Sequence, residues 1–420
     1  MILKPVTTSV VADCHITSMT VGKPFKTSHE SVVLGTSNGQ VLYYRPALAR
    51  VHTHPHERDV QESSDAEVAS AKSSYDTMNA HANADVHLSR HAVPSKHSNA
   101  IAHNQKVNKV EIKGGCLSHV LAHNLFEFGE VNIVTGDTDG VLSVLSDNRL
   151  FRQKCLHDGS SVVAVCVDTD VYTGTDKPRF NSIVAADSTG TITGLGSIFD
   201  TLWRIKLSHH ITYTDRMNSG IRAMTSLSML DEYGVRTHVL VVADGEENLH
   251  CISDGKLVCS VKINEPVVAM ETGWFLNIDA SRGESHTQQL LFVDEAGDAF
   301  VLHRFKVHAY ARHVNAVTHI QRIPLMAMGS AVDGAVMVGR WNTIKVFLDK
   351  EMVQDIPTSN WVNGVCLGEF AVDSISPHPA DDPALRGPSA RPLHVVTSQS
   401  DGTVSIFSVE QYPSPCIPQT

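Results

Sequence analysis

The chain has 420 residues, of which 42% are hydrophobic and 19% charged, so it carries enough apolar material for a large core. Its 34 basic and 45 acidic residues give a net charge of −11, which opposes the counterion release on which nucleic-acid binding depends. This composition excludes a globally disordered chain and argues against nucleic acid as a partner.

Two further features bear on where the protein acts. The first residues, MILKPVTTSVVADC, lack the basic start and apolar stretch of a secretion signal, and no apolar run approaches the roughly 18 residues of a membrane-spanning helix. The eight cysteines include no Cys-x-x-Cys pair and lie mostly in apolar strand-like segments, which favours buried, reduced thiols. We therefore expect a cytoplasmic protein with no direct membrane insertion.

One pattern recurs along the chain: a β-branched apolar run, a polar turn and an alternating apolar strand. It predicts a β-hairpin, because glycine supplies the positive φ that tight hairpin turns require. The structural turn glycines are Gly39, Gly140, Gly190, Gly297 and Gly402, and we expect Glu247 and Thr343 at this position in the other two units. In chain order the hairpins are Val33–Tyr44, Val134–Val144, Val184–Ile192, Val241–Leu249, Leu291–Phe300, Val336–Phe347 and Val396–Phe407.

Each hairpin belongs to a larger unit. One more apolar strand precedes each hairpin, and another precedes most of these, as at Lys106–Ile112 and Lys256–Ile263. The units recur roughly every 50 residues, the length of a four-stranded propeller blade, and no long segment has helical periodicity. The sequence predicts an all-β fold over residues 1–412, a seven-bladed β-propeller of four-stranded antiparallel blades. The expected blades are approximately 12–45, 105–146, 149–196, 201–253, 256–304, 314–349 and 351–409.

The ends and the inserts complete this prediction. The first blade lacks a strand, so either Ile2–Val11 or the C-terminal tail must pair into a terminal blade and close the ring. Residues 46–104 are rich in His and Ser and poor in large apolar side chains, which predicts one long disordered inter-blade insert. A Pro-rich loop is expected at 376–392 and a flexible tail at 413–420.

The strongest metal candidate in the sequence is a set of alternating histidines. His52, His54 and His56 could chelate a divalent ion in an extended conformation, but no carboxylate or thiol partner lies at a fixed spacing from them. We therefore expect no metal site and no cofactor.

Calcium and catalytic motifs are present only as fragments. The acidic turns Asp137–Asp139, Asp294–Glu295 and Asp333–Gly334 each hold part of the D-x-D-x-D-G series that binds calcium in integrin-type propellers. A hydroxyl, imidazole and carboxylate occur together at Ser208–His210 and Asp215, but such neighbours are common in polar loops, and no catalytic motif is present. The sequence favours a protein that is not an enzyme.

Three segments resemble FG-GAP-type intracellular propeller repeats: VVLGTSNGQVLYY (32–44), LWRIKL (202–207) and VDGAVMVGRWNTIKVFLDKEMVQDIP (332–357). WD40 repeats are a poorer match, because no blade has their Gly-His and Trp-Asp pair. Within the FG-GAP type, the chain resembles the integrin-alpha FG-GAP repeat-containing subunit of the KICSTOR complex, and next the propellers of BBSome subunits. The first resemblance implies a scaffold in nutrient signalling to the TORC1 kinase, recruited to the lysosome or vacuole through partners. The second implies ciliary cargo traffic.

Two functions of different classes remain open. The leading hypothesis is a scaffold or adaptor whose faces and rim strands dock other protein subunits of a complex. The alternative is a ligand- or carbohydrate-binding, or hydrolytic, propeller that uses its central channel, and it requires carboxylates and aromatic side chains at one end of the innermost strands. Those strands are expected at segments such as Val163–Val165, Arg222–Met224 and Val268–Met270. These segments are rich in Ala, Val, Met, Ser and Thr instead, which favours the scaffold.

Overall fold

The computed structural model describes residues 1–11, 14–23, 30–46, 48, 107–125, 131–147, 149–157, 159–168, 182–196, 198–207, 220–231, 233–278, 287–312, 314, 316–325, 330–370 and 392–410. The segments predicted as the 46–104 insert, the 376–392 loop and the 413–420 tail lie outside these residues, apart from Pro46, Leu48 and Pro392. Leu48 is 1% exposed, so the core extends into the first residues of the segment expected to be disordered. Within the described residues, no helix is long and apolar enough to span a membrane.

The described residues of the unit formed by residues 1–49 and 105–420 contain seven four-stranded antiparallel sheets. Blades 1 to 4 consist of β2 (Ile16–Gly22), β3 (Ser31–Thr36), β4 (Gln40–Tyr44) and β5 (Asn108–Glu111); β6 (Leu117–His123), β7 (Asn132–Asp137), β8 (Val141–Ser146) and β9 (Arg149–Cys155); β10 (Val162–Asp168), β11 (Ser182–Asp187), β12 (Thr191–Leu195) and β13 (Thr201–Lys206); and β14 (Ala223–Leu230), β15 (Arg236–Ala243), β16 (Asn248–Ser253) and β17 (Lys256–Lys262). Blades 5 to 7 consist of β18 (Val267–Gly273), β19 (Gln289–Asp294), β20 (Ala299–His303) and β21 (Lys306–Ala311); β22 (Val317–Ile323), β23 (Gly334–Gly339), β24 (Thr343–Leu348) and β25 (Glu351–Pro357); and β26 (Val362–Gly368), β27 (His394–Gln399), β28 (Thr403–Glu410) and β1 (Ile2–Val10).

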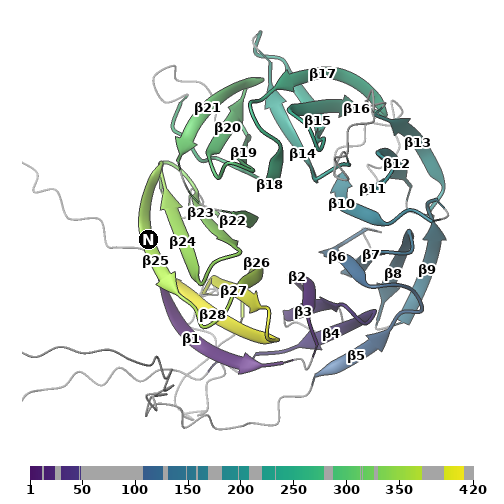
Figure 1. The fold of residues 1–420 in the computed structure, drawn as a ribbon, viewed down its shortest axis with the longest axis vertical. Coiled ribbons are helices and arrows are strands. Elements are labelled where there is room, and N and C mark those ends of the chain that lie inside the picture. Colours follow the sequence, from purple (N-terminus) through teal and green to yellow (C-terminus); the bar gives the residue numbers. More distant parts are fainter. Residues whose placement is uncertain are drawn as a thin grey trace, which may run out of the picture. The chain divides into compact units, whose positions relative to one another are not determined.

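The blades form a closed ring, with β2, β6, β10, β14, β18, β22 and β26 innermost (Figure 1). Each of the seven hydrophobic clusters in the described residues fills the space between two adjacent blades, and together they cover all seven junctions. Second strands such as β3, β7 and β11 are buried at every residue, because both faces of a blade pack on neighbours. The predicted seven-bladed propeller is confirmed.

The predicted blade boundaries are wrong by one strand. The prediction placed Lys106–Ile112 at the start of the second blade, whereas β5 pairs with β4 and ends the first. The intervals 149–196, 201–253, 256–304 and 351–409 contain the same error, since each begins with the outermost strand of the preceding blade, whereas 314–349 omits both β21 and β25. Apolar periodicity does not reveal which neighbour an edge strand pairs with. The short turn that precedes an edge strand does reveal its partner. In blade 4, Asp254 and Gly255, with φ of 49° and 72°, connect β16 directly to β17.

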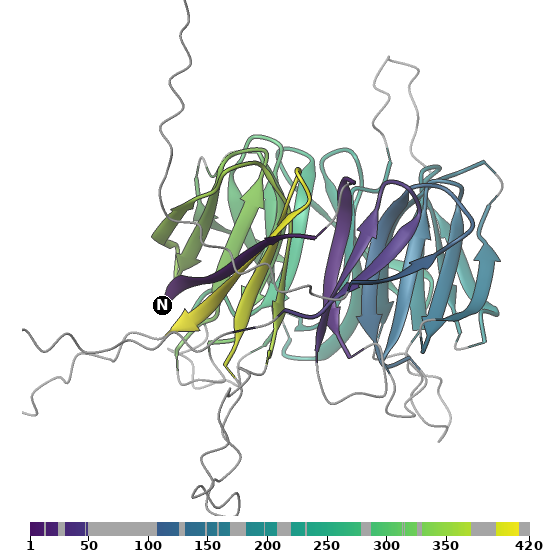
Figure 2. The ribbon, with the colours of Figure 1, turned by 90° about the horizontal axis from the view of Figure 1, so that it is seen from below.

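The N-terminal strand closes the ring, which settles the choice that the sequence left open. β1 runs antiparallel to β28, from Ile2 opposite Glu410 to Val10 opposite Thr403, with a bulge between Pro5 and Thr7 (Figure 2). The bulge suits Pro5, which has no amide hydrogen to donate to the ladder. The seventh blade therefore combines strands from both ends of the described chain.

The hairpin turns of all seven blades accept an equivalent hydrogen bond. All five predicted glycines have φ between 74° and 82°. In every blade, the turn carbonyl accepts a bond of 2.7–3.2 Å from an amide one to three residues after the outermost strand of the same blade. The acceptors in blades 4 and 6 are Glu247 and Asn342, so the expected Thr343 is wrong by one residue. Aligning Val336 with Val33 without a gap also leads to Asn342.

Candidate functional site

The candidate metal ligands of the sequence cannot be placed in the described part of the chain. His52, His54 and His56 lie outside the described residues, so that hypothesis stays a prediction. Within the described residues, no group of three or more His, Cys, Asp or Glu side chains is arranged to hold a metal ion.

The acidic turns use their carboxylates to hold the hairpins. Asp137 Oδ1 accepts the backbone amides of Asp139 and Val141 at 3.0 and 2.8 Å, and Asp187 and Asp244 repeat this arrangement. Asp294 likewise accepts the amide of Asp298 at 2.8 Å. The fragments at Asp137–Asp139 and Asp294–Glu295 are therefore explained as Asx-type turn contacts.

The innermost strands offer little chemistry to a ligand. None of the seven contains a Phe, Tyr or Trp, so they provide no aromatic platform for a sugar ring. Their carboxylates are confined to Asp168 and Glu271. Burial lowers the pKa of both His119 and His319 to about 4, and for His119 the nearby charge of His319 adds to the effect. Both imidazoles are therefore neutral near pH 7.

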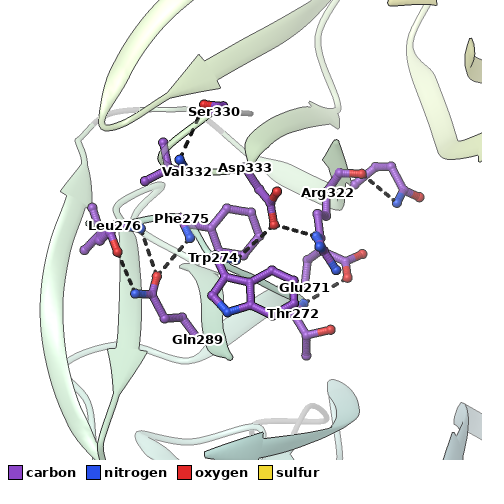
Figure 3. Close-up of polar contacts among 11 residues, drawn as sticks. Glu271, Thr272, Trp274, Phe275, Leu276, Gln289, Arg322, Ser330, Val332 and Asp333 are labelled. Carbon is purple, nitrogen blue, oxygen red and sulfur yellow. Dashed lines mark hydrogen bonds and ion pairs between the residues drawn. The ribbon is translucent and has the colours of Figure 1, made fainter. Parts of the chain in front are cut away.

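A polar cluster joins blades 5 and 6 (Figure 3). Arg322, on β22, donates from Nε to the Asp333 carboxylate at 2.6 Å, and its guanidinium carbon lies 4.4 Å from the centroid of the Trp274 ring. The fully buried Asp333 carboxylate also accepts the Trp274 amide at 3.1 Å, and the Asp333 amide donates to the Trp274 carbonyl at 2.7 Å. The Arg322 guanidinium and the Trp274 ring thus contact each other. The cluster connects the loop after β18 to the loop before β23.

Glu271 lies on β18 at the edge of this cluster (Figure 3). Burial raises its pKa to about 7, against the opposing effects of the Thr272 amide, which donates to the carboxylate at 2.9 Å, and the charge of Arg322. The carboxyl therefore titrates close to neutral pH within an inter-blade junction.

We expect Glu271→Gln to remove part of the pH dependence of stability. The pKa of Glu271 is higher in the folded than in the unfolded protein, so the protonated carboxyl stabilises the fold. This contribution is complete below about pH 4 and is lost as the pH rises through about 7. Between about pH 5 and pH 8 the native protein should lose about 1–2 kcal/mol of unfolding free energy that the variant keeps, allowing for partial exposure. Urea unfolding at both pH values measures this, and equal losses in the two proteins would contradict it.

Two Ser-His-Asp contacts involve blade 4. Ser228 Oγ lies 3.0 Å from His238 Nδ1, and His238 Nε2 lies 2.5 Å from Asp168 Oδ1 on β10 of blade 3. In a hydrolytic triad the carboxylate engages Nδ1 and the nucleophile lies at Nε2, so this order is reversed. His250 has the same reversed order, with Ser260 on Nδ1 and the turn residue Asp244 on Nε2, both at 2.8 Å. We interpret both as structural contacts; the sequence candidates Ser208–His210 and Asp215 lie outside the described residues.

The rim of the ring displays apolar side chains through a repeated β-bulge. In the outermost strands of blades 2, 3, 4 and 6, the pairing register shifts and leaves one extra residue. The extra residues are Phe151, Leu202, Val258 and Val353, which are 42–53% exposed. A bulge re-aims a side chain and interrupts the ladder, so these edges are poorly suited to pairing with a further strand.

Neighbouring residues enlarge this surface. Leu150, Leu257 and Met352 precede three of the bulged residues and are 47–51% exposed. We call these seven side chains the apolar rim. Exposed large apolar groups at equivalent positions of several blades indicate a contact surface, because isolated surface residues would not recur in this way. Adjacent apolar residues such as Leu257 and Val258 break the period-2 alternation, and this was the available sequence signal.

Comparison with known proteins places the chain among β-propellers. No family model and no curated protein matches the sequence. The chain is similar to BBS1N in crystals of its complex with ARL6DN: a lead-soaked crystal has TM-score 0.61, 8% identity and coverage of 97% of both chains, and a mercury-soaked one has TM-score 0.60, 9% identity and the same coverage. It is also similar to the WD40 β-propeller domain of Doa1, with TM-score 0.56, 11% identity and coverage of 97% of this chain and 98% of that one. At these identities the likeness concerns the fold alone.

Proposed function

We propose that the protein is a non-enzymatic scaffold that binds other protein subunits through the apolar rim. The observation that carries this proposal is the repetition of exposed, bulge-borne apolar side chains on the outermost strands of blades 2, 3, 4 and 6. Protein interfaces bury such groups at their centre, where charged residues are depleted. The innermost strands, without aromatic residues and with their carboxylates confined to Asp168 and Glu271, give no comparable support to a channel ligand.

The comparisons and the sequence resemblance support the same class of function. One similar propeller, BBS1N, was crystallised in complex with ARL6DN, which is consistent with a propeller acting as a binding partner. The FG-GAP resemblance extends the proposal to a cytoplasmic subunit of a KICSTOR-like complex in TORC1 signalling, recruited to the lysosome or vacuole through partners. A BBSome-like trafficking subunit is the alternative within this class.

The proposal is tested by replacing three rim residues. We expect Phe151→Glu/Val258→Glu/Val353→Glu to reduce recovery of co-purifying subunits from native cells at least tenfold, because each charge would have to be desolvated at the interface. Cross-linking mass spectrometry should place the native partners against β9, β13, β17 or β25. The control is Tyr233→Glu, which alters an 84% exposed residue between β14 and β15 and should leave recovery unchanged.

Two results would overturn the proposal. One is full recovery of the same subunits with the triple rim variant. The other is a native protein that elutes as a monomer and has no cross-linked partner. Far-UV circular dichroism and urea unfolding of all variants separate a lost interface from a lost fold.

A further inference from the structure

The charge on the rim is unevenly distributed around the ring. The outermost strands of four consecutive blades, β9, β13, β17 and β21, contain Lys and Arg but no Asp or Glu. In the next blade, β25 contains Glu351 and Asp355 and no basic residue. A one-signed stretch of this length is unexpected in a chain with a net charge of −11. The basic residues are Arg149, Arg152, Lys154, Arg204, Lys206, Lys256, Lys262 and Lys306.

Most of these cations are not neutralised within the described residues. The one ion pair among them joins Lys262 to Glu247 at 3.7 Å, with both side chains exposed. Asp147 and Asp200 lie nearby in the sequence but form no ion pair with these cations in the described part of the chain. The positive charge is therefore available to a partner.

Three of the cations are held in place at the junction of blades 2 and 3. Each donates to a backbone carbonyl of the other blade, which orients the side chain without cancelling its charge. The bonds run from Arg152 Nη1 to Ile198 O at 2.7 Å, from Lys154 Nζ to Phe199 O at 2.6 Å, and from Arg204 Nη2 to Leu156 O at 3.3 Å. Beside them, Phe151, Ile198 and Leu202 are 47–62% exposed. Apolar side chains thus lie among oriented cations.

We propose that the rim of blades 2 to 5 docks an acidic protein segment whose carboxylates alternate with apolar side chains. This inference rests on the proposed scaffold function and specifies the partner. Carboxylates match the cations, and the segment's apolar side chains match those of the apolar rim on blades 2 to 4. The bulges interrupt the edge ladders, so the segment is held by side chains and lies across blades.

Other polyanions fit this surface less well. A nucleic acid supplies phosphates but buries no apolar side chains, and the overall negative charge of the chain repels it. The rim of a ring is convex (Figure 1), so a flat bilayer would reach the edge of one blade at a time. An acidic peptide can follow the curvature and contact several blades together.

The test measures binding of a defined probe to the full chain. A fluorescein-labelled peptide of Glu-Glu-Leu-Phe repeats is titrated with native protein and with Arg149→Glu/Lys206→Glu/Lys256→Glu. We expect at least tenfold weaker binding by the variant, and weaker binding by both proteins as salt rises. These three side chains are exposed and make no hydrogen bond within the described residues, so their replacement should spare the fold. The control, Lys113→Glu/Arg236→Glu/Arg340→Glu, changes net charge equally at exposed sites outside the outermost strands of blades 2 to 5 and should bind like the native protein.

Each outcome is decisive. Equal peptide binding by the two charge variants would overturn the inference. So would stronger rim-dependent binding of oligothymidine, or of phosphatidylserine-phosphatidylcholine vesicles, than of the peptide. If native partners are lost with the apolar triple variant but retained with the rim charge variant, the scaffold function stands and the acidic partner fails. If neither variant loses them, both proposals fail.

Discussion

Deletion of residues 1–10 will abolish the folded monomer. β1 is the outermost strand of the seventh blade and pairs with β28 along its whole length, so its removal leaves β28 as an open edge. The deletion also removes Leu3, which is 1% exposed and packs in the cluster between blades 6 and 7. We expect the shortened chain to aggregate or to elute as larger species on size-exclusion chromatography. A shortened chain that remains monomeric with an unchanged melting temperature would contradict this role for β1.

A milder change isolates the packing contribution of the same strand. Leu3→Ala should lower the free energy of unfolding by about 2–5 kcal/mol, because the buried side chain leaves a cavity. The Gln354 side-chain amide bonds the Leu3 backbone nitrogen and oxygen at 2.8 and 3.0 Å, and these contacts remain in the variant. The matched control on the same strand is Val10→Ala, at a 72% exposed position, where the change should stay within about 0.5 kcal/mol.

The features that the sequence predicts correctly are local ones. A glycine such as Gly190 after a buried run indicates a tight turn whatever the tertiary surroundings, because glycine adopts the positive φ of such a turn without a steric cost. Repeating this signal reveals the number of blades. The period near 50 residues then reveals the strands per blade.

The features that the sequence does not reveal depend on pairing between distant or unmarked positions. The turn before β21 consists of Arg304 and Phe305 at φ of 50° and 59°. These residue types rarely have positive φ, so they do not predict that conformation. The bulge at Val258 exists only in the register between β16 and β17. The contact between Asp168 and His238 joins residues 70 positions apart. The register of the bulges and the contacts between blades therefore had to come from the structure.

Gly140→Ala should destabilise the protein far more than Gly234→Ala, although both glycines have nearly the same φ, 80° and 81°. A Cβ at Gly140 would lie 2.2 Å from the Ser160 carbonyl oxygen and 2.9 Å from that of His157, whereas a Cβ at Gly234 has nothing within 4 Å. Both variants share the cost of a left-handed alanine, about 1 kcal/mol after the entropy of the unfolded chain is allowed for. The clash with backbone should raise the total for Gly140→Ala to about 3 kcal/mol.

The difference between the two variants measures how tightly the hairpin turns are held. In blade 2 the Gly140 carbonyl accepts the Leu156 amide at 3.0 Å, so a side chain at Gly140 pushes against the segment that leads from β9 into blade 3. Urea unfolding of both variants gives the comparison, with equal denaturant slopes showing that the same structure unfolds. Equal losses would mean that the turn carries only backbone strain. A larger loss at Gly140 would show that the turn glycine is selected by close packing between one blade and the connection to the next.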